Sequence, residues 1–129
     1  MNFTEHMNVW NGLYPDLDNA FGSQCMDELH LYHVEVLGLT NKWYLATSGP
    51  KEIWSNFENI FGHEYFEKVP NTLTNIPQIG DIVIFGIGTY GHVSIFIEGD
   101  INNFNSFDQN YPIGSPCHVQ DHRYDGVLG

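Results

Sequence analysis

Positive charge is scarce in this sequence. Its 129 residues contain four Lys and Arg against sixteen Asp and Glu, which gives a formal net charge of -12. Binding of nucleic acid depends on cationic side chains that neutralise phosphates, so DNA and RNA are excluded as expected partners. Anionic membranes and cell-wall polymers would also repel this surface, although bound divalent cations and protonated histidines would weaken the repulsion.

Long apolar runs and a charged-then-apolar leader are also absent. No apolar run approaches the roughly 18 residues that a membrane span requires, so we expect a soluble chain without membrane insertion. Hydrophobic residues (42%) far outnumber charged residues (16%), which predicts a folded domain rather than a disordered one. We expect one domain over residues 1–129, excised from a longer protein because the chain stops within the apolar sequence Val127-Leu128-Gly129.

Only two cysteines are present, and a chain of this size does not need a disulfide to fold, so we expect two free thiols. Cys25 follows a run of closely spaced carboxylates at an expected helix start. The amide donors and the positive dipole end of a helix lower the pKa of a thiol, which favours Cys25 as a nucleophile. Cys117 has no such helix, and we interpret it as incidental.

The apolar periodicity changes along the chain from helical to alternating. Helices are expected over residues 4–10, 23–37 and 51–61, and strands over 66–69, 81–85, 91–98, 104–110 and 119–124. Segment 81–85 contains an unbroken apolar run, which predicts a central strand buried on both faces. The expected fold class is α+β, with N-terminal helices packed on a small antiparallel β-sheet.

A base for the thiol is expected on the strand that contains His92. A hairpin centred on Asp100 places His92 directly opposite Asp108, whereas a two-residue turn at Gly99-Asp100 would shift the register by one and separate them. Gly91 would leave the imidazole open to a cleft, and Asn110 would serve as a further polar orienter.

These residues predict an activated cysteine. Cys25 would attack, His92 would take its proton and later protonate the leaving amine, and Asp108 would fix the imidazole tautomer. The backbone amides of Gln24 and Cys25, at the helix start, would stabilise the oxyanion.

The carboxylates of Asp16 and Asp18 precede Gly22 and favour an oxygen-rich loop for a hard cation, although a solvated turn is the simpler alternative. Zinc would require His or Cys ligands. His30 and His33 lie one helical turn apart, but no third ligand is evident, so we interpret both as surface residues.

Four motifs give the chain a resemblance to the CHAP domains (cysteine, histidine-dependent amidohydrolases/peptidases) of bacteriophage endolysins and bacterial wall hydrolases. The motifs are Asp16-x-Asp18-x-x-x-Gly22-x-Gln24-Cys25-x-Asp27, Gly80-Asp81-Ile82-Val83-Ile84-Phe85, Gly91-His92-Val93-Ser94-Ile95 and Asp108-Gln109-Asn110-Tyr111. The resemblance implies a papain-like fold that hydrolyses an amide bond of peptidoglycan, with Cys25 as nucleophile and His92 as base. It also implies a Ca²⁺ cofactor, held by the side chains of Asp16, Asp18 and Asp27 and the carbonyls of Ala20 and Gly22.

The expected partner is therefore bacterial peptidoglycan, reached by a monomer that is made in the host cytoplasm and joined to a C-terminal wall-binding domain or a phage tail protein. Two alternatives stay open. One is an NlpC-type cysteine endopeptidase, which usually has a second histidine as its third residue. The other is a non-catalytic, calcium-stabilised wall-binding or virion module. The sequence does not distinguish an amidase from an endopeptidase.

Overall fold

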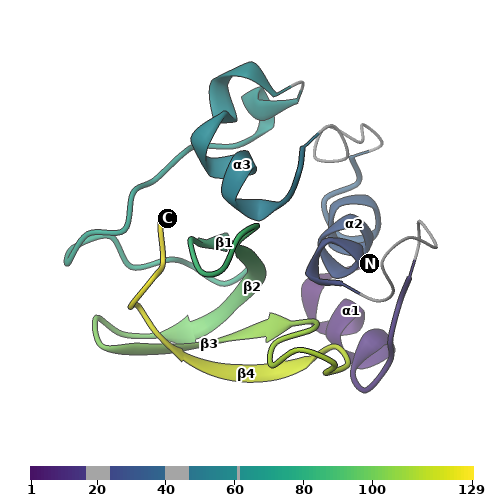
Figure 1. Ribbon diagram of the computed structural model, residues 1–129. Helices are drawn as coiled ribbons and strands as arrows, with labels where there is room; N and C mark the ends of the chain where they lie inside the picture. Colours follow the sequence, from purple (N-terminus) through teal and green to yellow (C-terminus); the bar gives the residue numbers. More distant parts are fainter. Residues whose placement is uncertain (17–23, 40–46, 61) are drawn as a thin grey trace.

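The computed structural model describes residues 1–16, 24–39, 47–60 and 62–129. Its centre is an antiparallel sheet with strand order β1-β2-β3-β4 (Figure 1). The strands are β1 (Ile82–Phe85), β2 (His92–Gly99), β3 (Asn103–Asp108) and β4 (His118–Arg123). Helices precede the sheet along the chain, so the expected α+β class and the small antiparallel sheet are confirmed at this level.

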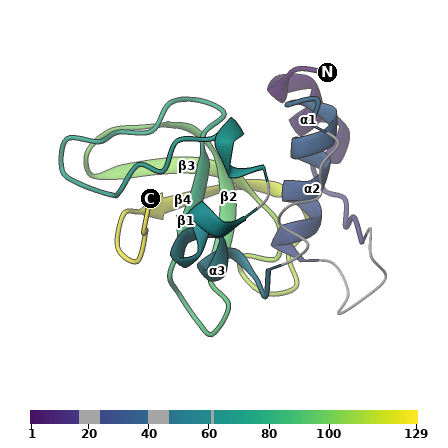
Figure 2. The same ribbon diagram turned by 90° about the horizontal axis from the view of Figure 1, so that it is seen from above.

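The helices are α1 (Phe3–Trp10), α2 (Cys25–Glu35) and α3 (Pro50–Ser55), followed by the 3-10 turns η2 (Phe57–Asn59) and η3 (His63–Tyr65). Helices α1 and α2 lie side by side at one end of the molecule, while α3 lies near β1 and β2 (Figure 2). The cap of α1 is Asn2, whose side chain accepts a hydrogen bond from the Glu5 amide. The third helix is shorter than predicted because its second half continues as 3-10 turns.

A buried histidine joins α1 to α2. Nε2 of His6 lies 3.0 Å from Oε1 of Glu28, and its Nδ1 lies 3.4 Å from Oε2 of Glu35. Trp10 donates its indole N–H to the same Glu35 oxygen at 3.0 Å. Because a buried polar group costs free energy unless it is paired, these contacts fix how the two helices dock.

The two faces of the sheet are covered by separate apolar clusters. Strand alternation sends Ile84, Val93, Ile95 and Phe107 towards the helices, where they join Leu29 and other residues of the main core. The opposite face holds a second cluster of Val83, Phe85, Phe96, Phe104 and Val127. This division decides where the side chains of the candidate site lie.

The prediction that segment 81–85 is buried on both faces is confirmed, since Val83 and Ile84 belong to different apolar clusters, but its predicted central position is wrong because β1 is the edge of the sheet. Its outer side is covered by the C-terminal residues instead: Ile84 donates to Gly129 at 2.7 Å, and Leu128 donates to Ile84 at 2.8 Å. This cover explains an apolar sequence at an edge position. The expected strand at 66–69 is also wrong, since those residues join no ladder.

Among the described residues, no helix combines the length and the apolar character needed to cross a membrane.

Candidate active site

His92 and Asp108 are brought together as predicted. Nε2 of His92 lies 2.6 Å from Oδ2 of Asp108, and both side chains are buried. The register that achieves this differs from the prediction. Ile95 pairs with Phe107 and Phe96 with Ser106, so the ladder places Asp108 diagonally from His92 rather than directly opposite.

A β-bulge in β2 keeps the two residues on one face. At the turn, Gly99 pairs with Phe104 and Glu98 with Asn105, a register that would send His92 and Asp108 to opposite faces if it continued. The register shifts by one between Phe96 and Glu98, and this extra residue restores a common face.

A second histidine, His122 on β4, completes the cluster. Its Nε2 lies 2.9 Å from the same Oδ2 atom, while the Ser106 hydroxyl donates to Oδ1. Burial by itself raises the pKa of Asp108, but the hydrogen bonds from His122 and His92 outweigh it and lower the pKa. Asp108 is therefore a carboxylate at neutral pH, and it fixes the orientation of His92.

The sequence prediction missed His122 and Ser106. Alternation along residues 104–110 places Ser106 on the same face as Asp108 but does not indicate its role. His122 needed the pairing of β3 with β4, in which Phe104 lies opposite His122. Alternation within residues 119–124 was the only available signal, and it does not reveal the partner strand.

His92 is not open to a cleft, as was expected from Gly91. The imidazole is 5% exposed and lies between two rings, with centroids 5.2 Å from Phe85 and 4.9 Å from Tyr111. Gly91 has a structural reason: its φ is +81°, and a Cβ there would lie 2.6 Å from the carbonyl oxygen of Phe85.

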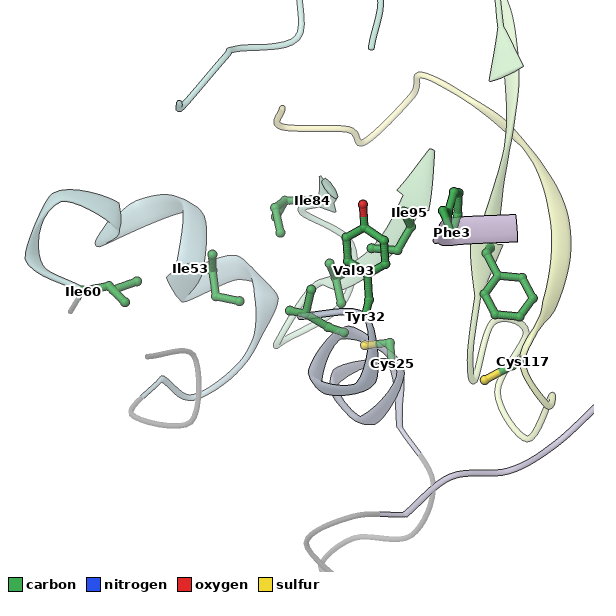
Figure 3. Packing of buried hydrophobic residues seen from close by; sticks show 11 residues of the cluster. Phe3, Cys25, Tyr32, Ile53, Ile60, Ile84, Val93, Ile95 and Cys117 are labelled. Carbon is green, nitrogen blue, oxygen red and sulfur yellow. The ribbon is translucent and has the colours of Figure 1, made fainter. Parts of the chain in front are cut away.

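Cys25 is the first residue of α2, in agreement with the expected helix start. A capping box closes the start of α2, in which the Asp27 side chain accepts a hydrogen bond from the Gln24 backbone amide at 2.8 Å. This bond occupies the Gln24 amide, so the Cys25 amide is the remaining oxyanion donor of the expected pair. The thiol itself is buried among apolar side chains (Figure 3).

The expected lowering of the Cys25 pKa is wrong for this conformation. Burial raises the pKa of the thiol to about 11, a backbone hydrogen bond from Val93 lowers it, and the negative charges of Glu28 and Asp108 raise it further. In the resting protein the Cys25 side chain is therefore a neutral thiol at physiological pH.

The side chains of Cys25 and His92 lie against different apolar clusters and are not joined. The thiol contacts the backbone of Val93, the residue that follows His92, within the helix-facing cluster. The His92 ring contacts Phe85 of the opposite cluster. Between these two described residues there is no hydrogen bond.

Asn110 follows β3 and does not orient His92. Its φ is +61°, and its side-chain oxygen accepts a hydrogen bond from the Gly114 amide at 2.7 Å. The Asn110 amide donates to Ser115. In the described contacts Asn110 therefore stabilises the turn after β3, and Asp108 alone has the orienting position.

The expected calcium ligands are described only in part. Asp18, Ala20 and Gly22 lie outside the described residues. Oδ1 of Asp16 is buried and has no hydrogen-bond partner, while Asp27 is buried at the start of α2. An orphaned buried carboxylate oxygen is the atom a hard cation would bind, so Asp16 fits the expected Ca²⁺, whereas Oδ2 of Asp27 already accepts a hydrogen bond from the Gln24 amide.

Gln109 ties this acidic segment to the helix that bears Cys25. Its side chain donates to the Pro15 carbonyl at 2.8 Å and accepts from the Glu28 amide at 3.0 Å. Being fully buried, Gln109 links the residue before Asp16 to the first turn of α2.

Cys117 and His33 have structural roles. Cys25 and Cys117 are free thiols, as expected. Cys117 is fully buried and exchanges backbone hydrogen bonds with residues 12 and 13, and burial strongly raises its pKa. His33 was expected at the surface but is fully buried, stacked on Phe66.

A scan against models of known protein families finds no match to this chain.

Proposed function

We propose that this protein is a peptidoglycan hydrolase with a papain-like, CHAP-type fold, which cleaves an amide bond through Cys25, His92 and Asp108. The observation that carries the proposal is the His92–Asp108 hydrogen bond of 2.6 Å beside the helix that begins with Cys25. A carboxylate on Nε2 fixes the imidazole tautomer and leaves Nδ1 as the base. The order of the cysteine, histidine and acid motifs in the sequence points to the same chemistry.

Because the thiol is neutral at rest, His92 acts as a general base rather than as the imidazolium of a preformed thiolate–imidazolium pair. In the proposed mechanism, substrate binding brings the Cys25 thiol, which contacts Val93 at rest, within hydrogen-bond distance of Nδ1 of His92. The thiol proton passes to Nδ1, and the sulfur attacks the substrate carbonyl carbon. The resulting oxyanion accepts a hydrogen bond from the Cys25 amide.

Collapse of the tetrahedral intermediate breaks the C–N bond, and His92 gives its proton to the leaving amine. Water then attacks the thioester, with His92 taking one proton from it, and releases the carboxylic acid product and the thiol. Asp108 remains ionised throughout and stabilises the imidazolium formed at each step.

The same proposal includes Ca²⁺ held by Asp16 and Asp27, with Asp18, Ala20 and Gly22 as further ligands. The cation would supply positive charge that offsets these carboxylates and would brace the start of α2. Gln109 supports this coupling, because it joins Pro15 to the first turn of α2.

The proposal is tested by loss of turbidity of a bacterial wall suspension. Cys25→Ser should abolish lysis while the thermal melt shows a folded protein, and Cys117→Ser, the matched control at the other buried thiol, should retain it. Mass spectrometry of the digested wall then assigns the bond as sugar-to-peptide or peptide-to-peptide. Lysis by Cys25→Ser would refute the nucleophile.

One alternative has specific support. The raised Cys25 pKa and the absence of a hydrogen bond between the described Cys25 and His92 side chains favour a non-catalytic wall-binding or virion module. Such a module would bind walls without releasing any peptide.

The NlpC-type alternative is less favoured, because Asp108 rather than a histidine contacts Nε2 of His92.

A further inference from the structure

We propose that His92, Asp108 and His122 form a zinc site whose occupancy switches off the base of the active site. The three residues offer one ligand atom each, and these atoms all lie within 4.8 Å of one another. All three side chains are buried. Two imidazoles and one carboxylate are a donor set suited to Zn²⁺ and unsuited to Ca²⁺, which takes oxygen ligands.

The three ligand atoms already lie close enough together for side-chain movements to bring them onto one zinc ion. Nε2 of His92 and Nε2 of His122 lie 2.6 and 2.9 Å from Oδ2 of Asp108. Zinc bonds of about 2.0–2.2 Å place tetrahedral ligand atoms about 3.3 Å apart, so the two contacts with Asp108 lengthen by less than an ångström. The two Nε2 atoms, which lie within 4.8 Å of each other, adjust to the same spacing. A water molecule takes the fourth position.

Protons balance without an outside acid or base. Each Nε2 now donates to Asp108, and zinc requires the lone pair at that nitrogen. The proton of each imidazole therefore moves from Nε2 to Nδ1, while Asp108 binds zinc through Oδ2, the oxygen that now accepts both hydrogen bonds.

Ser106 provides the outer support that such a site requires. Its hydroxyl donates to Oδ1 of Asp108, which leaves Oδ2 to face the two imidazoles. Outer hydrogen bonds of this kind orient ligands and contribute to metal affinity. Ser106 is fully buried, so water does not compete for this contact.

The surface beside His122 favours entry of a cation. A hollow over the β2–β3 turn and β4 is lined by Glu98, Asp100 and Asp121 as well as by His122. Arg123, also in its lining, is the one cationic side chain there. With three carboxylates against one guanidinium, and a net charge of -12 over the chain, divalent cations concentrate at this entrance.

Zinc at this position inactivates His92 in two ways. It occupies Nε2 and breaks the hydrogen bond to Asp108, and it leaves the proton on Nδ1, the atom that must accept the proton of Cys25. The inhibition rests on the proposed function, whereas the binding of zinc does not.

Binding is measured first, by titrating Zn²⁺ in a calorimeter in excess Ca²⁺ with the Cys25→Ser/Cys117→Ser protein, so that neither thiol contributes. We expect one zinc per chain, and Co²⁺ in its place should give the visible absorption of a tetrahedral site. His122→Gln should lower the affinity by more than about 100-fold. The matched control is His118→Gln, a partly buried histidine of the same strand that bonds Tyr111 instead, and it should bind zinc normally.

Inhibition is measured next, with the native cysteines. Zinc should stop lysis by the His118→Gln protein as it does by the parent, and His122→Gln should require a far higher concentration. If His122→Gln does not fold, Asp108→Asn replaces it in the calorimeter. Absence of stoichiometric zinc binding by the parent protein overturns the site. Unchanged zinc affinity in His122→Gln, or in Asp108→Asn where that variant replaces it, also overturns it. Stoichiometric binding by a protein that never lyses walls upholds the site and refutes only the proposed function.

Discussion

Asp108 accepts hydrogen bonds from His92 and His122 on one carboxylate oxygen, at 2.6 and 2.9 Å. The two histidines come from strands on either side of β3, so this single carboxylate ties three strands together at one end of the sheet. It has one orienting role towards His92 and a second, structural role towards His122.

Replacing this carboxylate tests its role towards His92. Asp108→Asn keeps the size of the side chain but removes the charge that stabilises imidazolium, so we expect the rate of wall lysis to fall by about 10³–10⁴-fold. Ser106→Ala removes only the hydrogen bond to the other oxygen and should cost much less. Initial lysis rates at saturating wall concentration, with thermal melts of each variant, provide the comparison. Full activity in Asp108→Asn would contradict the role assigned to Asp108.

The sequence predicted the strands of this site better than their arrangement. Alternation over residues 91–98 and 104–110 placed His92 and Asp108 on the correct faces, because one buried face specifies which side chains point inward. The bulge that corrects the register is visible only in the pairing of β2 with β3, and the alternation does not encode it.

Contacts between distant segments account for the errors. An apolar run at residues 82–85 looks the same whether a strand or the C-terminal residues cover it, so β1 was predicted as central when it is the edge. The wrong prediction of a lowered Cys25 pKa has the same cause. A helix start was visible in the sequence, but the packing of Cys25 against Val93 and the nearby charges of Glu28 and Asp108 were not.

The raised thiol pKa predicts an unusual pH profile for alkylation. In the Cys117→Ser protein, the rate of reaction of Cys25 with iodoacetamide follows the thiolate fraction. We expect slow labelling at pH 7 and a rate that still rises above the ordinary pKa of about 8.5, because burial raises the Cys25 pKa to about 11. Mass spectrometry of the labelled protein over a series of pH values measures this. A plateau below pH 8 would show that the resting thiol is already activated.

Glu28 should make the fold less stable as pH rises. Burial raises the pKa of Glu28 from 4.5 to about 7, against the opposing hydrogen bond from His6. Between these values the folded protein holds a proton that the unfolded chain releases, so the stabilisation is complete below pH 4.5 and lost as pH rises through 7. The loss is on the order of 3 kcal/mol.

Urea unfolding between pH 5 and 8 tests this, with Glu28→Gln and Glu35→Gln as a matched pair. Both carboxylates contact His6, but the Glu35 side chain is 27% exposed and no more than 1% of the Glu28 side chain is exposed. Glu28→Gln should make the free energy of unfolding depend less on pH in this range. Glu35→Gln should keep most of the dependence seen in the parent protein. An equal effect of the two variants would assign the dependence to His6 rather than to Glu28.

Calcium should stabilise the fold through Asp16. Ligand binding to the folded state alone adds about 2.7 kcal/mol when the cation is present at about 100 times its dissociation constant. We therefore expect chelation to lower the melting temperature and the lysis rate of the parent protein, and re-addition of Ca²⁺ to restore both. Asp16→Asn should lose this response, because it neutralises the carboxylate whose Oδ1 is buried without a partner. Asp125→Asn removes the same charge from an exposed side chain, so it should respond to calcium as the parent does.

Since Gln109 joins Pro15 to the first turn of α2, Gln109→Ala should keep calcium binding but weaken its effect on lysis. If calcium changes neither the melting temperature nor the activity of the parent protein, the acidic segment is a solvated turn.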